Sequence, residues 1–257
     1  MLVSVIIITL NEADNIESTI MAVKNAAVLS SGKSISLELI VSDGGSNDGT
    51  TNIAKNLVDK IIIGNKGRYK QLNAGAEGSK GDVLLFLHAD TLLPKGAILR
   101  VCSILKDSKI IGGGFKKCWN WNPELKRTSF LTFISFLWQT LDNWIVNILK
   151  NIPGDNAIFV RKSFFKELNG FSTMWICEDL DIMRRMKRYG KKRIIYIPSA
   201  VITSTRRFEK YGFFRTVFVW FLIGLFWKLG MPQIKIKKRF KKYSTVPKRG
   251  NKTNLRF

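Results

Sequence analysis

The stretch Gly81-Asp82-Val83-Leu84-Leu85-Phe86-Leu87-His88-Ala89-Asp90 joins five consecutive apolar residues to a polar tip. A run of this length and composition predicts a short β-strand that is buried on both faces. In an open α/β sheet, ligands bind beyond the carboxyl ends of the parallel strands, which is where His88 and Asp90 would lie. An ordinary strand capped by a polar turn is the alternative interpretation, so the neighbouring segments must decide between the two.

Further strands are predicted on both sides of this segment, at residues 3–9, 37–41, 60–63, 110–115, 157–160 and 193–197. Helices are predicted from residue 11, over 68–77, 95–105 and 128–149, and from the acidic run at 178–181. This alternation predicts an α/β domain with a mostly parallel central sheet and helices on both faces. The loops after the first, second and fourth strands then share one edge, where these polar side chains would converge: Thr9, Asn11, Glu12, Asp43, His88 and Asp90.

The charge of the chain is strongly positive, with 42 Lys and Arg against 19 Asp and Glu and a net charge of +23. Eleven of these basic residues lie between Lys228 and Phe257, where there is no acidic residue. Such a basic tail is typical of proteins that contact anionic lipid headgroups or nucleic acid. Three cysteines without paired spacing argue against a disulfide framework or a zinc site and indicate a reducing, cytoplasmic compartment.

Two apolar segments follow the predicted sheet. Residues 128–149 carry aromatic and aliphatic side chains at helical spacing, for which packing in the core is the default interpretation and a membrane-facing role the alternative. The run Thr216–Trp227 would be about 18 Å long as a helix, too short for a hydrocarbon core of about 30 Å. It is either an interfacial anchor beside the basic tail or a helix packed on the domain. We therefore divide the chain into a catalytic domain (1–211), an apolar helix (212–230) and a basic tail (231–257).

Four motifs in order resemble the family 2 nucleotide-sugar glycosyltransferases, from Val3 to about Arg207. They are Ser4-Val5-Ile6-Ile7-Ile8-Thr9-Leu10-Asn11-Glu12, Val41-Ser42-Asp43-Gly44-Gly45-Ser46-Asn47-Asp48-Gly49-Thr50, Phe86-Leu87-His88-Ala89-Asp90 and Glu178-Asp179. The resemblance implies a single-domain GT-A fold and an inverting transfer of a sugar from a nucleotide diphosphate to a hydroxyl or phosphate acceptor. Lipid-linked acceptors are compatible with the basic tail. The motif typical of processive polymerases, Gln-x-x-Arg-Trp, is absent, so long-chain synthesis is not expected.

Carried over residue by residue, the resemblance assigns roles to most of the predicted edge. The residues that the resemblance assigns to donor-nucleotide binding are Thr9, Asn11, Glu12 and Asp43. Arg68 and Gln71 would line the same pocket. His88-Ala89-Asp90 stands where the family has Asp-x-Asp, so Asp90 would bind Mn²⁺ or Mg²⁺, and His88 is either a second ligand or a hydrogen-bonding residue. Asp179 matches the general base, with Glu178 beside it.

Two further pairs of residues have competing interpretations. Arg206 and Arg207 would clamp the pyrophosphate or an acceptor phosphate, since guanidinium groups bind phosphate in a bidentate geometry. Solvated surface arginines are the alternative. Asp155 and Asn156 would contact the donor sugar or the acceptor, or simply form a turn.

Other functions are disfavoured by specific features of the sequence. Sugar-phosphate nucleotidyltransfer needs a Gly-rich loop directly after the first strand, where Leu10-Asn11-Glu12-Ala13-Asp14 contains no glycine. Neither a dinucleotide fingerprint nor a Walker motif is present. The net charge suggests a nucleic-acid binder, yet the basic excess lies in the tail and the predicted sheet edge is acidic. We therefore expect a nucleotide-sugar partner, no nucleic acid, and peripheral contact with the anionic inner face of the membrane.

Overall fold

The computed structural model describes residues 1–28, 35–64, 66–120 and 129–244. The strands are β1 (Val3–Thr9), β2 (Leu37–Asp43), β3 (Lys60–Ile63), β4 (Val83–His88), β5 (Thr91–Leu92), β6 (Gly112–Asn120), β7 (Phe159–Arg161) and β8 (Ile194–Ser204). The helices are α1 (Ala13–Ala26), α2 (Thr50–Ala54), α3 (Arg68–Glu77), α4 (Ala97–Ile104), α5 (Ser129–Leu149), α6 (Lys162–Glu167), α7 (Glu178–Lys187), α8 (Arg206–Tyr211), α9 (Phe213–Lys228) and α10 (Gln233–Ser244).

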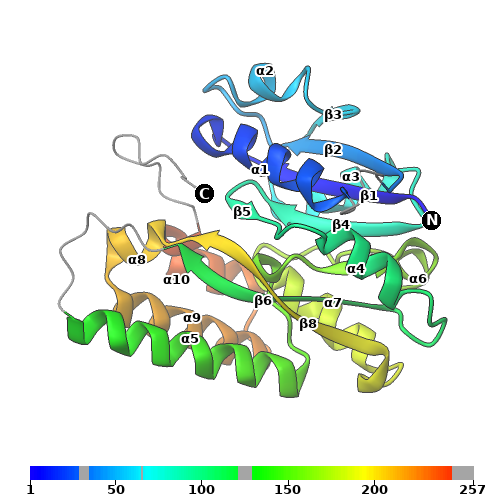
Figure 1. Cartoon of the computed structure of the whole chain (residues 1–257). Helices are drawn as coiled ribbons and strands as arrows, with labels where there is room; N and C mark the ends of the chain where they lie inside the picture. The colour runs from blue at the N-terminus through cyan, green and yellow to red at the C-terminus, as the bar shows by residue number, and fades with distance from the viewer. Residues whose placement is uncertain (29–34, 65, 121–128, 245–257) are drawn as a thin grey trace.

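One eight-stranded sheet organises the described residues, in the order β3-β2-β1-β4-β7-β6-β8-β5. Pairs β1–β2, β1–β4, β2–β3 and β6–β8 are parallel, whereas β7 and β5 run against their neighbours. The sheet is therefore mixed but mostly parallel, as predicted. The order also places the carboxyl ends of β1, β2 and β4 at one edge (Figure 1).

The core lies on both faces of the sheet, because β1 and β4 are buried on each side. Val5 and Ile7 of β1 pack with α1 and α4 in one apolar cluster. Ile6 and Ile8 face the other way and pack with α3, α6 and α7. The continuous apolar runs of β1 and β4 follow from this arrangement, since every side chain of a strand covered on both faces must be apolar or paired.

Strands β6 and β8 are longer than predicted, reaching Asn120 and Ser204. They pair along their whole length, with a register shift between Phe115 and Lys116. The glycines at the start of β6 allow close packing of the strands. A Cβ atom at Gly113 would lie 2.0 Å from the carbonyl oxygen of Ile195, and one at Gly112 would lie 2.4 Å from that of Phe159.

The C-terminal residues fold further than predicted. Residues 233–244 of the expected basic tail form α10, whose Ile236 and Phe240 are 0% and 6% exposed. They pack with Val219 and Ile223 of α9 and with Ile176, so α9 and α10 are part of the folded domain. The segment predicted as a basic tail (231–257) therefore includes the packed helix α10, and residues 245–257 lie outside the described part of the chain.

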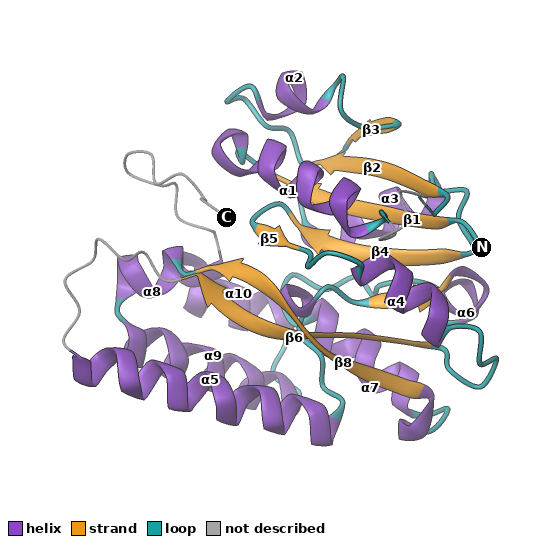
Figure 2. Cartoon of the chain, viewed as in Figure 1, coloured by secondary structure: helices purple, strands orange, loops and turns teal. Residues whose placement is uncertain are grey.

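Helix α5 does not bury its apolar stripe, so the prediction that this stripe packs in the core is wrong for most of it. Within the described side chains of α5, the buried ones are Ser135, Asn143 and Val146. Figure 2 shows α5 beside α9, along the side of the molecule away from β1, β2 and β3. Among the described residues, no helix combines the length and apolar character needed to cross a bilayer.

Candidate active site

Side chains predicted to bind the nucleotide connect the loops after β1 and β2 through hydrogen bonds. Thr9 Oγ1 donates to Asp43 Oδ1 over 2.8 Å. The other carboxylate oxygen of Asp43 accepts from the backbone N–H groups of Gly45 (2.8 Å) and Ser46 (2.7 Å). Asp43 is 1% exposed, so it shapes the turn that follows β2 and presents this turn at the sheet edge.

Asn11 and Gln71 complete this network. Asn11 has a left-handed backbone (φ 57°); its N–H donates to Ser46 Oγ over 2.8 Å and its Oδ1 accepts from the N–H of Asn47 over 3.0 Å. Gln71 Nε2 donates to the carbonyl oxygens of Thr9 (2.6 Å) and Ser42 (3.0 Å). The structure thus brings together Thr9, Asn11, Asp43 and Gln71 as one rim, beside the pocket described below and not in its lining.

A buried ion triad joins three distant parts of the chain. The terminal Nη2 of Arg206 donates to Glu12 Oε1 over 2.9 Å and to Asp90 Oδ2 over 2.6 Å. Burial and the neighbouring Asp90 raise the pKa of Glu12, against the opposing effect of Arg206. Burial alone would lower the pKa of Arg206, but Asp90 and Glu12 raise it above its ordinary value. Arg206 is therefore a permanent buried cation between two carboxyl groups, which rules out for it the alternative of a solvated surface arginine.

An open pocket with about 490 Å³ of empty space lies next to the triad. Its lining combines charged residues with three aromatic rings: Arg68, His88, Asp90, Trp119, Asp155, Thr203, Ser204, Arg206, Arg207, Phe208 and Trp220. Three guanidinium groups in one pocket favour an anionic ligand.

Arg207 is the pocket cation with the clearest sign of a ligand. Its Nε is buried and has no hydrogen-bond partner among the described residues. Burial, followed by the nearby Arg68, lowers the pKa of Arg207. Since a buried donor without a partner costs about 1–3 kcal/mol, an anion that accepts from Nε would relieve this cost.

Arg68 and Glu178 form a second buried pair, with Nη1 and Oε1 3.2 Å apart. Glu178 is 2% exposed and its Oε2 has no hydrogen-bond partner among the described residues. Burial raises the pKa of Glu178 although Arg68 opposes the shift. Close by, burial alone would raise the pKa of Asp155, but His88, Lys117 and Arg207 hold it below its ordinary value. Asp155, in the lining of the pocket, therefore favours its charged form, whereas Glu178, which pairs with Arg68 outside that lining, favours its protonated form.

Asp179 and His88 meet at the turn Gly154–Asn156. Asp179 Oδ2 accepts from the N–H of Gly154 over 2.7 Å. A Cβ atom added at Gly154 would lie 2.9 Å from His88 Nε2 and 3.5 Å from Asp179 Oδ2. A side chain at position 154 would have to displace the His88 ring, and the turn holds Asp179 beside the residue that ends β4.

Asn156 does not take part in the pocket. It is 0% exposed, and its Nδ2 donates to the carbonyl oxygen of Phe115 over 2.6 Å. These contacts fit the alternative of a structural turn residue, while Asn156 Oδ1 is buried without a hydrogen-bond partner among the described residues. That Asn156 contacts donor sugar or acceptor stays a prediction.

The carboxylates of the pocket fit a divalent cation only in part. Among the described residues, no group of three His, Cys, Asp or Glu side chains could hold a metal ion. His88 and Asp90 both line the pocket, and Mg²⁺ commonly takes only one or two carboxylates when substrate phosphates supply further ligands. His88 and Asp90 could therefore supply at most two protein ligands, and the remaining ligands of a cation would have to come from water or a bound molecule.

Sequence reasoning missed the aromatic and basic residues supplied by β6 and α9. Trp119 packs on Phe208 (ring centroids 4.7 Å apart), which packs on Trp220 (5.2 Å). Lys117 is 4% exposed and pairs with Asp142. The spacing of Lys117 and Trp119 could have indicated these residues, because side chains two positions apart in a strand lie on the same face of the sheet.

A mostly parallel sheet with a cationic, carboxylate-bearing pocket beyond its strand ends is the arrangement of the GT-A glycosyltransferases, which confirms the predicted fold class. The chain belongs to glycosyl transferase family 2, whose model matches residues 4–168.

Two curated relatives are similar to part of the chain. The chain is 28% identical to the probable glycosyltransferase YdaM of Bacillus subtilis over 179 residues, which cover 64% of this chain and 42% of YdaM. It is 39% identical to the glycosyltransferase AglE of Haloferax volcanii over 95 residues, which cover 34% of this chain and 30% of AglE. The chain thus matches less than half the length of either relative.

The solved structures show the fold. Glucosyl-3-phosphoglycerate synthase from Mycobacterium tuberculosis, solved with Mn²⁺, UDP and glucosyl-3-phosphoglycerate, superposes with a TM-score of 0.58 at 20% identity, covering 90% of this chain and 80% of that one. The mannosyltransferase PcManGT from Pyrobaculum calidifontis, solved with GDP-Man and Mn²⁺, superposes with a TM-score of 0.60 at 16% identity, covering 90% and 64%.

The buried carboxyl group of Glu178 makes stability depend on pH. Because its folded pKa is raised above 4.5, the folded protein retains a proton that the unfolded chain has released. The free energy of unfolding therefore falls as pH rises from 4.5 through the raised pKa, and this contribution vanishes in Glu178→Gln. We expect the stability of the variant relative to the parent to increase with pH, measured by urea denaturation from about pH 5 to about pH 8. A difference that stays constant over this range would contradict the assignment.

Proposed function

We propose that this protein is an inverting, metal-dependent glycosyltransferase that moves a sugar from a nucleoside diphosphate to a hydroxyl or phosphate acceptor, with a lipid-linked acceptor at the cytoplasmic face of the membrane. The observation that carries the proposal is the pocket itself. Arg207, with its buried and unpartnered Nε, lies in the same pocket as Asp90, at the edge where the loop after β4 ends.

The donor diphosphate is the ligand that suits this charge pattern. As the bond between sugar and diphosphate breaks, negative charge grows on the leaving phosphate, and Arg207 is placed to hold it. Asp90 and His88 would hold Mn²⁺ or Mg²⁺, which supplies further stabilisation of this charge when bound. The rim built from Thr9, Asn11, Asp43 and Gln71 lies beside the pocket, where the nucleoside would extend. Arg206, tied to Glu12 and Asp90, would keep that side of the pocket in place.

Asp179 is the group proposed to act on the acceptor. It would take the proton of an acceptor hydroxyl, whose oxygen attacks the anomeric carbon on the face opposite the leaving diphosphate. One bond forms as the other breaks, so the configuration at that carbon inverts. Glu178, with its raised pKa and its pairing to Arg68, would bind acceptor or tune the charge of Asp179.

A donor screen by thermal shift tests the function. A ligand that binds the folded state raises the melting temperature, so we expect UDP- or GDP-sugars with Mn²⁺ to raise it, and EDTA to reduce the effect. Arg207→Met should weaken binding of the nucleoside diphosphate more than that of the monophosphate, whereas the exposed Arg188→Met should leave both unchanged. If no nucleotide in the panel shifts the melting temperature, the proposed donor class is wrong.

A further inference from the structure

The polarity of α5 is reversed relative to an ordinary surface helix. Its inward side is mostly polar: Ser135, Gln139, Asp142, Asn143 and Val146 are buried or half-buried. These polar groups have specific partners in β6. Gln139 Oε1 accepts from the N–H of Trp119 over 2.7 Å. Asn143 accepts from the N–H of Lys117 and donates to its carbonyl oxygen, both over 2.9 Å. The helix is therefore bound to the edge of the domain through hydrogen bonds, and its rotation about its own axis is determined by them.

Two further contacts secure the same orientation. Lys117 Nζ lies 3.2 Å from Asp142 Oδ2, and Tyr196 Oη donates to Asn143 Oδ1 over 2.7 Å. Rotating α5 to bury its apolar side would break these bonds and leave the buried Lys117 unpaired, which is costly. The hydrogen bonds and the ion pair on the polar side of α5 therefore keep its apolar side facing outward.

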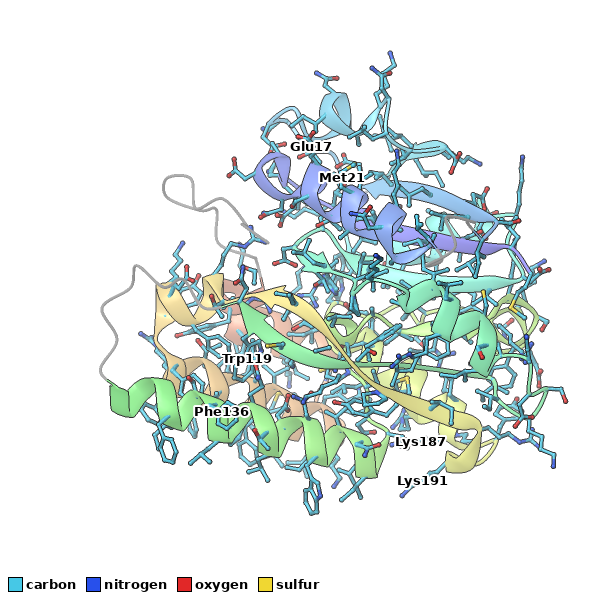
Figure 3. The ribbon with its side chains drawn as sticks, in the orientation of Figure 1. Glu17, Met21, Trp119, Phe136, Lys187 and Lys191 are labelled. Atoms are coloured by element: carbon cyan, nitrogen blue, oxygen red, sulfur yellow. The ribbon has the colours of Figure 1, made fainter. Side chains whose placement is uncertain are left out.

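That outward side carries eight large apolar side chains that are 37–61% exposed: Phe133, Phe136, Leu137, Trp138, Leu141, Trp144, Ile145 and Ile148. In a soluble monomer, a contiguous apolar patch of this kind indicates an interaction site. In Figure 3, Phe136 and the residues Lys187 and Lys191 lie toward one end of the molecule, and Glu17 and Met21 toward the other.

Helix α9 adds a second apolar stripe. Phe214, Phe218 and Phe221 are 60–63% exposed and Leu225 is 36% exposed, at spacings of three and four residues along one side of the helix. The two helices meet where Ile134 of α5 packs against the cluster that contains Phe213, Val217 and Trp220 of α9. We call the eight outward residues of α5 together with these four residues of α9 the outer apolar face.

Basic residues lie on the helices that carry and support the outer apolar face. Between residues 212 and 244 the sequence contains eight Lys or Arg and no Asp or Glu. Arg215 and Lys228 are exposed on α9 itself, and the other six lie in α10, which packs on Val219 and Ile223 of α9. At the C-terminal end of α5, Lys187 Nζ donates to Asn151 and to the carbonyl oxygen of Leu149. A face of Trp, Phe and Leu bordered by Lys and Arg has the composition of helices that lie in the interface of an anionic membrane.

We propose that the outer apolar face docks on the surface of an anionic lipid bilayer, with α5 and α9 lying in the interfacial layer. Charge complementarity selects this occupant over a second copy of the chain, because two copies would bring together borders of the same positive sign. Docking of this kind needs no membrane-crossing helix. It also requires no transfer reaction, so it can be measured on the protein without any donor or acceptor.

Vesicle flotation of the full chain tests the proposal. We expect the protein to float with vesicles of phosphatidylcholine and phosphatidylglycerol, and to float less with phosphatidylcholine alone or at high salt. The double variant Phe136→Glu/Trp144→Glu should lower the partition coefficient about tenfold or more, since it removes two apolar rings and adds two carboxylates near anionic headgroups. Both side chains are 61% exposed, so the variant should keep its melting temperature.

The matched control is Ile63→Glu, an apolar residue that is 72% exposed on β3, outside the outer apolar face. It should leave flotation unchanged. Absence of flotation with anionic vesicles would overturn the proposal, as would equal flotation of parent and double variant. A stable dimer in light scattering that the double variant dissociates, without any flotation of the parent, would assign the face to a second copy instead. Nucleotide-sugar binding is measured in a separate experiment. Absence of flotation would therefore leave the proposed glycosyltransferase function unaffected, and absence of donor binding would leave the proposed membrane docking unaffected.

Discussion

Asp179→Asn is expected to lower kcat for sugar transfer by about 10²–10⁴-fold while donor affinity stays within a few-fold, because a general base contributes roughly that factor to the rate. The amide cannot accept a proton from the acceptor hydroxyl. It can still accept one backbone hydrogen bond, either from Gly154 or from Leu180, both of which now donate to the carboxylate. Single-turnover transfer and donor titration, measured on the same preparation, separate the rate from the binding.

Asp14→Asn is the matched control, since Asp14 is an exposed carboxylate in the first turn of α1. It should transfer sugar at the parental rate. Equal activity in Asp179→Asn and the parent would remove Asp179 as the base. A loss of donor binding equal to the loss of rate would instead indicate that Asp179 acts by holding the turn at Gly154.

Arg206→Met is expected to lower the free energy of unfolding by about 3–5 kcal/mol, which is the usual cost of removing one partner from a buried ion pair. Methionine fills part of the space but leaves Glu12 and Asp90 facing each other without a cation. The two carboxyl groups come from the loops after β1 and β4, so the loss also loosens the edge that forms the pocket. Urea denaturation at neutral pH measures the change.

A rescue experiment tests whether the uncompensated carboxylates cause the loss of stability in Arg206→Met. Combining Arg206→Met with Glu12→Gln and Asp90→Asn removes the uncompensated charges, and we expect it to recover a large part of the lost stability. Arg188→Met, at an exposed arginine, should change stability by no more than about 0.5 kcal/mol. A triple variant that is less stable than the single variant would show that packing of Arg206, and not its charge, stabilises this edge.

Much of the sheet could be predicted because its strands are continuous apolar runs. β1, β2 and β4 begin and end within about two residues of the predicted positions, since largely buried apolar runs contrast sharply with the polar turns that follow. β3 also lies where it was predicted, although none of its side chains is buried. β6 and β8 were predicted too short. Their later halves contain Lys, Trp, Pro and Ser, a composition that does not show the pattern of a buried strand. In β6 this half contacts α5 through polar groups.

Periodicity could not determine which side of a helix faces inward. The 128–149 pattern correctly predicted a helix with one apolar side, but the partners of its polar side lie in β6, about 20–26 residues away in sequence. The same limit applies to the pocket. His88, Asp90 and Asp179 stand out as motif residues, whereas the bond from Arg206 to Glu12 spans 194 positions and depends on the tertiary fold.

Trp220 has a consequence for how an acceptor would reach the pocket. It belongs to α9 and lines the pocket, while its neighbour Phe221 is 63% exposed on the outer apolar face. The thickness of α9 therefore separates the pocket from the surface on which the molecule would rest. An amphiphilic acceptor could slide in sideways by two-dimensional diffusion and keep its hydrocarbon chain in the leaflet, whereas the water-soluble donor would enter from the opposite, aqueous side.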